Sequence, residues 1–254
     1  MTTTLLPYTY LFILGLTLGS FFNVVGLRIP VGQSIVKPPS HCPQCNERLR
    51  FMDLIPVLSY LSFRGKCRHC KGRISPMYPL MELATAVLFT ISPMLVGWSK
   101  ELMIALALIS LLMIIFISDI HYMIIPDKVL VFFFGLLVLL RVVVPFDPWW
   151  SPIAGALIGF FIMYAIAVVS KGGMGGGDIK LFAVLGIALG LQMTLFTIFL
   201  SAFYGSVIGL IGMAFGKVKR GKPIPFGPFI VLGVLTAYFF GDELLEIYLH
   251  FLQL

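Results

Sequence analysis

The feature that most constrains this chain is a succession of apolar runs, many of them about as long as the stretch of helix that crosses a lipid bilayer. Of the 254 residues, 59% are hydrophobic and only 11% are charged, so one water-facing core could not hold the apolar surface. The sequence therefore predicts an all-α integral membrane protein with about eight transmembrane helices. We place these helices near Tyr8–Leu27, Tyr78–Trp98, Leu102–Ser118, Val129–Val144, Pro152–Val169, Ile179–Leu191, Met193–Phe215 and Phe226–Phe240.

The distribution of charge predicts how the chain crosses the membrane. A net charge of +7 is compatible with nucleic-acid binding, but the cations follow the predicted topology instead. If the segment after Arg28 is cytoplasmic, sixteen of the 18 Lys and Arg residues lie on the cytoplasmic side, and only Lys100 and Arg141 lie outside. We therefore expect membrane lipid, and no nucleic acid, around the protein. The chain divides into a first span (1–27), a cytoplasmic basic segment (28–77) and a polytopic membrane region (78–254).

The four cysteines of the chain form two Cys-x-x-Cys pairs in the basic segment, separated by 21 residues. They are Cys42, Cys45, Cys67 and Cys70. A reducing compartment argues against disulfides, and two pairs of this kind can present four thiolates tetrahedrally to Zn²⁺. Because four thiolates close the coordination sphere, the sequence predicts a structural zinc site. A redox pair or four unrelated thiols is the alternative.

Two of the eleven acidic residues stand out by position. Asp119 ends an unbroken apolar run, and Asp178 follows a glycine-rich run and opens the next predicted span. A carboxylate costs about 2.5–3.5 kcal/mol at the centre of a membrane helix, so a carboxylate near the hydrocarbon is a functional candidate by default. The predicted topology places both at the cytoplasmic surface. Alternatively, Asp178 caps its helix and Asp119 forms an interfacial ion pair, while Asp127 competes with Asp119 for the functional role.

The glycines Gly175, Gly176 and Gly177 lie directly before Asp178. Their run fits neither a phosphate-binding loop nor a dinucleotide fingerprint. Glycine does permit an extended backbone, such as that of a peptide substrate, to approach the neighbouring carboxylate closely. Two facing carboxylates that share a proton are the arrangement of aspartic proteases, in which one activates water and the other polarises the scissile carbonyl.

Six ordered motifs carry a resemblance to a known family. They are Gly19–Val24, Pro38–Pro43, Asp53–Pro56, Tyr78–Glu82, Asp119–Asp127 and Gly173–Leu181. Over essentially the whole chain, the sequence resembles the type IV prepilin peptidase family, membrane aspartic proteases of the GxGD kind. The resemblance implies that Asp119 and Asp178 are catalytic, and that the tetracysteine segment holds zinc. It also implies that the enzyme cuts the short basic leader of prepilins and pseudopilins after a glycine, at the cytoplasmic face of the bacterial inner membrane.

The resemblance further implies a second activity, N-methylation of the newly exposed residue with S-adenosylmethionine. Glu82 is the group that we expect to orient the new terminal amine, although a carboxylate near a helix N-terminus has a purely electrostatic explanation as well. The family often has Arg just before the Tyr-Pro-Leu run, where this chain has Met77.

Three alternatives stay open from the sequence. The first is a non-catalytic membrane protein that assembles a pilus, secretion or DNA-uptake apparatus and uses its zinc module for docking. The second is a transporter or channel, which predicts ionisable groups near the middle of the bilayer. The third is a GxGD protease that acts on other single-span substrates.

Pairs of glycines four residues apart predict close packing between helices. They are Gly15 and Gly19, Gly155 and Gly159, Gly186 and Gly190, and Gly205 and Gly209.

Overall fold

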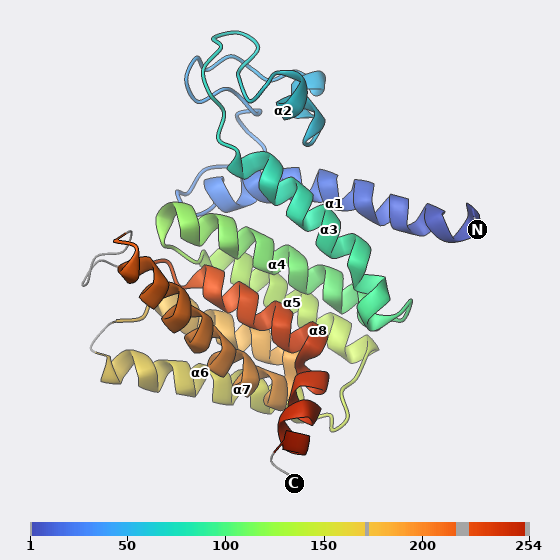
Figure 1. Ribbon diagram of the computed structural model, residues 1–254, viewed down its shortest axis with the longest axis vertical. Coiled ribbons are helices and arrows are strands. Elements are labelled where there is room, and N and C mark those ends of the chain that lie inside the picture. The colour runs from blue at the N-terminus through green and yellow to red at the C-terminus, as the bar shows by residue number, and fades with distance from the viewer. Residues whose placement is uncertain (1, 171–172, 217–223, 252–254) are drawn as a thin grey trace. The chain divides into compact units, whose positions relative to one another are not determined.

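The computed structural model describes residues 2–170, 173–216 and 224–251, and within them the chain is helical apart from its connecting segments (Figure 1). Five of the cations that predict the topology, Lys171, Lys217, Lys219, Arg220 and Lys222, lie outside these residues. The helices are α1 (Thr2–Arg28), the 3₁₀-helix η1 (Phe51–Leu54), α2 (Leu58–Ser62), α3 (Met77–Val96), α4 (Glu101–Tyr122), α5 (Asp127–Val143), α6 (Ser151–Val169), α7 (Gly176–Ala214) and α8 (Gly227–Phe251).

The predicted membrane architecture is confirmed. In the described part of the chain, six helices are long and apolar enough to cross a bilayer, namely α1, α3, α4, α6, α7 and α8. The predicted span near Val129–Val144 is α5, which has 17 residues. The 39 residues of α7 contain two predicted spans, and α8 continues beyond the predicted end at Phe240. The chain is therefore a multi-pass membrane protein.

The chain folds as two compact units, residues 1–117 and 118–254. In the first unit, α1 packs along α3, as Figure 1 shows. The glycine pair of α1 makes this contact possible. A Cβ atom at Gly15 would lie 2.5 Å from Cα of Ala86, and one at Gly19 would lie 2.8 Å from Cα of Glu82. The prediction of close packing is confirmed for this pair, and it brings α1 directly against the backbone that carries Glu82.

In the second unit, α7 packs against α5, α6 and α8. The contact with α6 is again made by glycine, because a Cβ atom at Gly186 would lie 2.2 Å from the backbone nitrogen of Ala156. Gly155 is equally restricted, with the backbone of Gly190 only 2.7 Å from the position of its missing Cβ. The packing prediction is wrong at Gly209, where nothing lies within 4 Å.

A break at Gly190 divides α7 into the two segments expected from the sequence. Its φ of 72° is a left-handed conformation that glycine adopts without strain. Polar groups released by the break are satisfied by neighbours. The hydroxyl of Ser151 accepts a hydrogen bond from the N–H of Leu191 at 3.0 Å, and Arg141 donates to the carbonyl of Ala188. The first half of α7, which begins with the last two glycines of the run, is thus held at its far end.

Candidate active site and metal centre

The first candidate carboxylate, Asp119, lies near the end of α4 and belongs to the second unit. Only 5% of the residue is exposed. Its Oδ2 accepts a hydrogen bond from the backbone N–H of Gly227, the first residue of α8, at 2.6 Å. The first N–H groups of a helix lack partners within the helix and carry partial positive charge, so they suit a carboxylate. The start of α8 therefore fixes one oxygen of Asp119.

The turn after α4 holds the backbone around Asp119. The hydroxyl of Ser118, which is buried, donates a hydrogen bond to the carbonyl of Ile124. Met123 adopts a positive φ of 54°, and its N–H donates to the carbonyl of Asp119 at 2.9 Å. Helix α4 thus ends at Tyr122, three residues after the carboxylate, and the chain turns at Met123 before it continues into α5.

The second candidate carboxylate, Asp178, is the third residue of α7 and is 7% exposed. Its N–H donates to the carbonyl of Gly175 at 3.1 Å. Gly177, beside it, packs against Ile125 so closely that a Cβ atom would lie 2.8 Å from the Cβ of Ile125. The turn that follows Asp119 therefore lies against the start of α7. Both carboxylates are buried, and this contact brings together the two helix ends that carry them in the second unit.

Asp127, the competitor for the role of Asp119, has a different environment. It is the first residue of α5, and its carboxylate forms an ion pair with Nζ of Lys180 at 2.8 Å. The side chains are 62% and 55% exposed. An exposed and neutralised carboxylate is poorly suited to share a proton with a buried one. Asp119 and Asp178 are thus both buried, whereas Asp127 is exposed and paired with a cation.

The three glycines proposed for substrate binding differ in their surroundings. Gly175 precedes α7, and Gly176 and Gly177 are its first two residues, so the end of the glycine run is helical. Gly176 borders open space, because nothing lies within 4 Å of the position of a Cβ atom. At Gly175 that position is 3.4 Å from Oδ2 of Asp178, an ordinary contact. Close packing against Ile125 therefore leaves no room for a side chain at Gly177, whereas the position of Gly176 is open.

The four cysteines come together in the first unit as the sequence predicts. Their Sγ atoms all lie within 4.8 Å of one another, and those of Cys42 and Cys70 are 3.9 Å apart. A tetrahedral zinc site with bonds of about 2.3 Å requires sulfur atoms about 3.8 Å apart. Each pair lies in a similar loop, since the N–H of Cys42 donates to the carbonyl of Glu47 and the N–H of Cys67 donates to that of Gly72. The cluster fits a metal ion with four thiolate ligands.

The backbone around Cys42 favours a thiolate at this residue. Burial acts to raise the pKa of Cys42, but hydrogen bonds from the backbone N–H groups of Cys45 and Gln44 outweigh it and lower that pKa to about 7. A thiolate, and not a thiol, is the form that binds a metal. Cys42 is therefore prepared to act as a ligand at neutral pH.

Glu82 lies in the first unit, on α3, and is buried. Its Oε2 accepts a hydrogen bond from the N–H of Val57 at 2.8 Å, and the hydroxyl of Ser20 interacts with the same carboxylate. Nearby on α1, the amide of Asn23 donates to the carbonyl of Tyr78 at 3.2 Å. Glu82 thus joins the basic segment to two membrane helices, a structural task that the sequence did not suggest.

Comparison with known families covers most of the chain. Residues 13–96 match the Bacterial Peptidase A24 N-terminal domain, and residues 106–210 match the Type IV leader peptidase family. The protein named prepilin leader peptidase/N-methyltransferase in Bacillus subtilis (strain 168) is 44% identical over 239 residues, which is 94% of this chain and 96% of that protein. This chain belongs to the type IV leader peptidase family. It is therefore a member of a family of membrane proteases.

Other relatives of this chain carry the same name as the Bacillus subtilis protein. The prepilin leader peptidase/N-methyltransferase of Stutzerimonas stutzeri is 32% identical over 270 residues, covering 95% of this chain and 93% of that protein. That of Myxococcus xanthus (strain DK1622) is 37% identical over 209 residues, covering 80% of this chain and 62% of that protein. No solved structure matches the chain.

One residue of the candidate site, Gly227, was not predicted from the sequence. A Cβ atom there would lie 2.7 Å from Oδ2 of Asp119 and 2.8 Å from its Cβ, so only glycine fits against this carboxylate. A signal was present in the sequence, because Gly227 precedes Pro228 at the start of a predicted span, where proline marks the first turn of a helix. That signal predicts where the helix starts, but it does not predict that Gly227 contacts Asp119.

Proposed function

We propose that this protein cleaves the leader from prepilins and pseudopilins with Asp119 and Asp178 as its catalytic pair. The observation that carries the proposal is that both carboxyl groups are buried at helix ends, which the packing of Gly177 against Ile125 brings together, in a chain that belongs to the leader peptidase family. Both residues lie at helix ends, one near the end of α4 and one in the first turn of α7. The pair can therefore meet a peptide that reaches it from the membrane surface.

The chemistry follows from two carboxyl groups that share one proton. The ionised group takes a proton from a water molecule, whose oxygen attacks the scissile carbonyl carbon. The protonated group donates a hydrogen bond to the carbonyl oxygen and stabilises the tetrahedral intermediate. When the C–N bond breaks, a proton passes from the pair to the leaving amine. No covalent enzyme intermediate is required. The N–H of Gly227 holds Asp119 in place through these steps.

The substrate side of the proposal rests on the glycines and on charge. Gly176 borders open space next to the first turn of α7, so an extended peptide backbone can approach Asp178 there. The cation distribution predicts that both aspartates lie at the cytoplasmic face, where a leader attached to a membrane helix would be found. A basic leader is attracted by the carboxylates of this site and repelled by the basic segment.

The tetracysteine cluster is proposed to hold zinc in a structural role. Four thiolates leave no open coordination position for a substrate or water, so the metal supplies folding energy and not chemistry. The segment needs this contribution because, of the residues between Arg28 and Met77, few besides Cys42 and Cys67 are buried.

The second proposed activity is N-methylation of the new terminal residue, with S-adenosylmethionine as the methyl donor. Glu82 is proposed to orient the terminal amine, in addition to the hydrogen bond that it accepts from Val57. The described residues contain no glycine-rich nucleotide loop, so we assign no side chain to the methyl donor.

The function is tested with the purified full chain in liposomes and a prepilin substrate, with and without S-adenosylmethionine. Mass spectrometry of the products should show a cut after the leader glycine in both cases, and a mature chain one methyl group heavier only with the donor. If none of several prepilins is cleaved, the non-catalytic assembly role becomes the better explanation. Cleavage without methylation would contradict only the second activity.

A further inference from the structure

The net charge of the chain is concentrated in one place. Residues 28–77 contain nine Lys and Arg residues and two acidic residues, a net charge of +7 that equals the charge of the whole chain. Among the described residues, eight of these cations are exposed and none of the eight pairs with an acidic side chain. They are Lys37, Arg48, Arg50, Arg64, Lys66, Arg68, Lys71 and Arg73.

The same segment exposes large apolar side chains. η1 and α2 contact each other, and together they carry the five exposed residues that we call the η1–α2 patch. The members of the η1–α2 patch are Phe51, Met52, Leu54, Leu58 and Leu61, with Phe51 82% exposed. So many exposed apolar side chains in a short segment mark a surface that binds something else.

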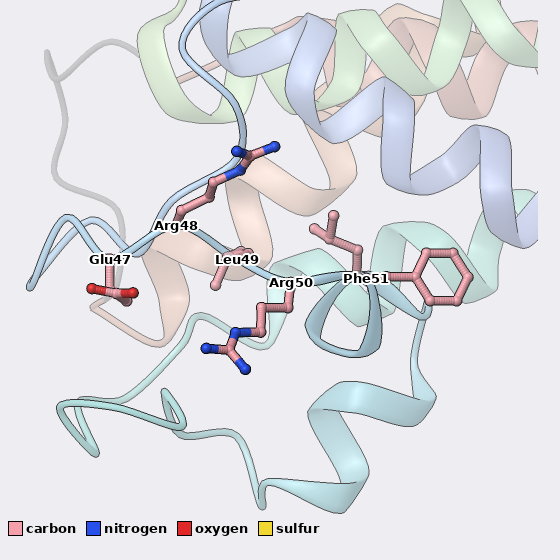
Figure 2. Close-up of a pocket in the computed structure, with 6 residues that line it drawn as sticks. Glu47, Arg48, Leu49, Arg50 and Phe51 are labelled. Atoms are coloured by element: carbon pink, nitrogen blue, oxygen red, sulfur yellow. The ribbon is translucent and has the colours of Figure 1, made fainter.

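Cations flank the η1–α2 patch on both sides in the sequence. Arg48 and Arg50 precede η1, and Arg64 follows α2. Arg48, Arg50, Phe51 and Leu54 line a pocket of about 530 Å³, and Figure 2 shows the side chains of the first three extending from the ribbon. Apolar and basic residues therefore line the same pocket at η1.

The position of the segment in the chain limits what this surface can meet. Its first residue, Arg28, closes the membrane helix α1, and its last residue, Met77, opens the membrane helix α3. Both ends are thus held at the membrane. A surface that combines exposed cations with Phe and Leu side chains is typical of protein elements that bind an anionic lipid interface. A basic peptide would be repelled by it.

We propose that the η1–α2 patch docks on anionic phospholipid headgroups of the membrane that the protein spans. Phe51 and Leu58 enter the interface, and Arg48, Arg50 and Arg64 contact phosphate groups. The metal site supports this surface, because the Cys-x-x-Cys pairs lie before and after it and close the loop of residues 46–66 that carries it. Anionic lipid thereby holds the basic segment against the bilayer.

Amide hydrogen exchange of the full chain in nanodiscs tests the proposal and does not require cleavage activity. One set of nanodiscs contains phosphatidylcholine alone, and the other also contains phosphatidylglycerol. Amides of residues 48–63 should exchange at least about fivefold more slowly in the nanodiscs that contain anionic lipid. High salt should reduce this protection.

Two variants and a control identify the groups responsible. The triple change Arg48→Gln, Arg50→Gln and Arg64→Gln should abolish the difference between the lipids, and so should Phe51→Ser with Leu58→Ser. Lys100→Gln removes an exposed cation outside the basic segment and should leave the difference unchanged. A metal content equal to that of the wild type shows that each variant keeps its two Cys-x-x-Cys pairs folded.

Equal exchange of residues 48–63 in both nanodiscs would overturn the proposal. Protection that appears only after a prepilin is added would overturn it as well, because the η1–α2 patch would then be a docking surface for protein. Both results are distinct from a failure of the proposed peptidase function, since no step of the measurement depends on activity.

Discussion

The backbone N–H of Gly227 donates a hydrogen bond to Oδ2 of Asp119 at 2.6 Å, across 108 residues of sequence. The two residues belong to the start of α8 and the end of α4. A helix N-terminus thus touches one member of the proposed catalytic pair directly. The position of α8 is consequently part of the geometry of the site, although α8 carries neither aspartate.

Replacement of Gly227 by alanine should reduce cleavage while the protein stays folded. The new Cβ would lie 2.7 Å from Oδ2 of Asp119, so either the carboxylate or the helix must move. A displacement of about 1 Å in a catalytic group can cost about 10²-fold in rate. The rate of prepilin cleavage by Gly227→Ala measures this effect. Gly135→Ala is the matched control, because nothing lies within 4 Å of its Cβ position, and wild-type activity in Gly227→Ala would contradict the positioning role.

Substitution of one thiolate should empty the metal site. Cys42→Ser removes a buried ligand from a cluster whose four sulfur atoms lie within 4.8 Å, and affinity for zinc should fall by more than about 100-fold. Metal content after dialysis against a chelator measures the loss, and exchange of the backbone amides between residues 42 and 70 should rise. His69→Ala should retain the metal, because four thiolates already complete the site. Loss of metal in that control would show that the ligand set is different.

The contact between α6 and α7 should be intolerant of a single methyl group. In Gly186→Ala the new Cβ would lie 2.2 Å from the backbone nitrogen of Ala156, which cannot move independently of its helix. The expected loss of stability is about 1–3 kcal/mol or more, seen as a lower midpoint of thermal unfolding in detergent. Gly209→Ala, in the same helix but with open space, should be neutral or slightly stabilising. Equal midpoints for the two variants would refute the packing argument.

Glu82 should separate the two proposed activities. Glutamine can still accept the hydrogen bond from Val57 through its carbonyl oxygen, but it lacks the charge that would orient an amine. Glu82→Gln should therefore cleave prepilin normally and methylate the product poorly, which the mass of the mature chain reports. Glu82→Ala, which also loses the bond to Val57, should destabilise the basic segment. Normal methylation by Glu82→Gln would leave Glu82 with a structural role alone.

Much of the fold was predictable because lipid imposes simple rules. Long apolar runs have few alternatives to helices in a bilayer, so the apolar runs placed most helix ends to within a few residues, although α8 continues well beyond its predicted end at Phe240. The Cys-x-x-Cys spacing predicted the cluster for a similar reason, since a metal site fixes ligand types and distances. The glycine pairs predicted close contacts correctly at Gly15 and Gly186, while at Gly209 the same pattern has no packed neighbour.

The partners of individual residues were harder to predict. The sequence placed Asp119 and Asp127 equally well at the membrane surface, and only the fold shows that Lys180 pairs with Asp127. The hydrogen bond from Gly227 depends on where α8 begins relative to α4, a relation that no local pattern encodes. The same holds for Glu82 and Val57, which lie 25 residues apart on different elements.

The most direct test of the central claim is the initial rate of prepilin cleavage by Asp119→Asn, Asp178→Asn and Asp127→Asn in liposomes. Thermal unfolding of each variant confirms that it is folded. The first two should lose at least about 10²–10⁴-fold in rate, because asparagine keeps the shape but cannot exchange a proton. Asp127→Asn should stay within a few-fold of wild type, since it breaks only an exposed ion pair. Wild-type cleavage by either of the first two variants would contradict the catalytic pair.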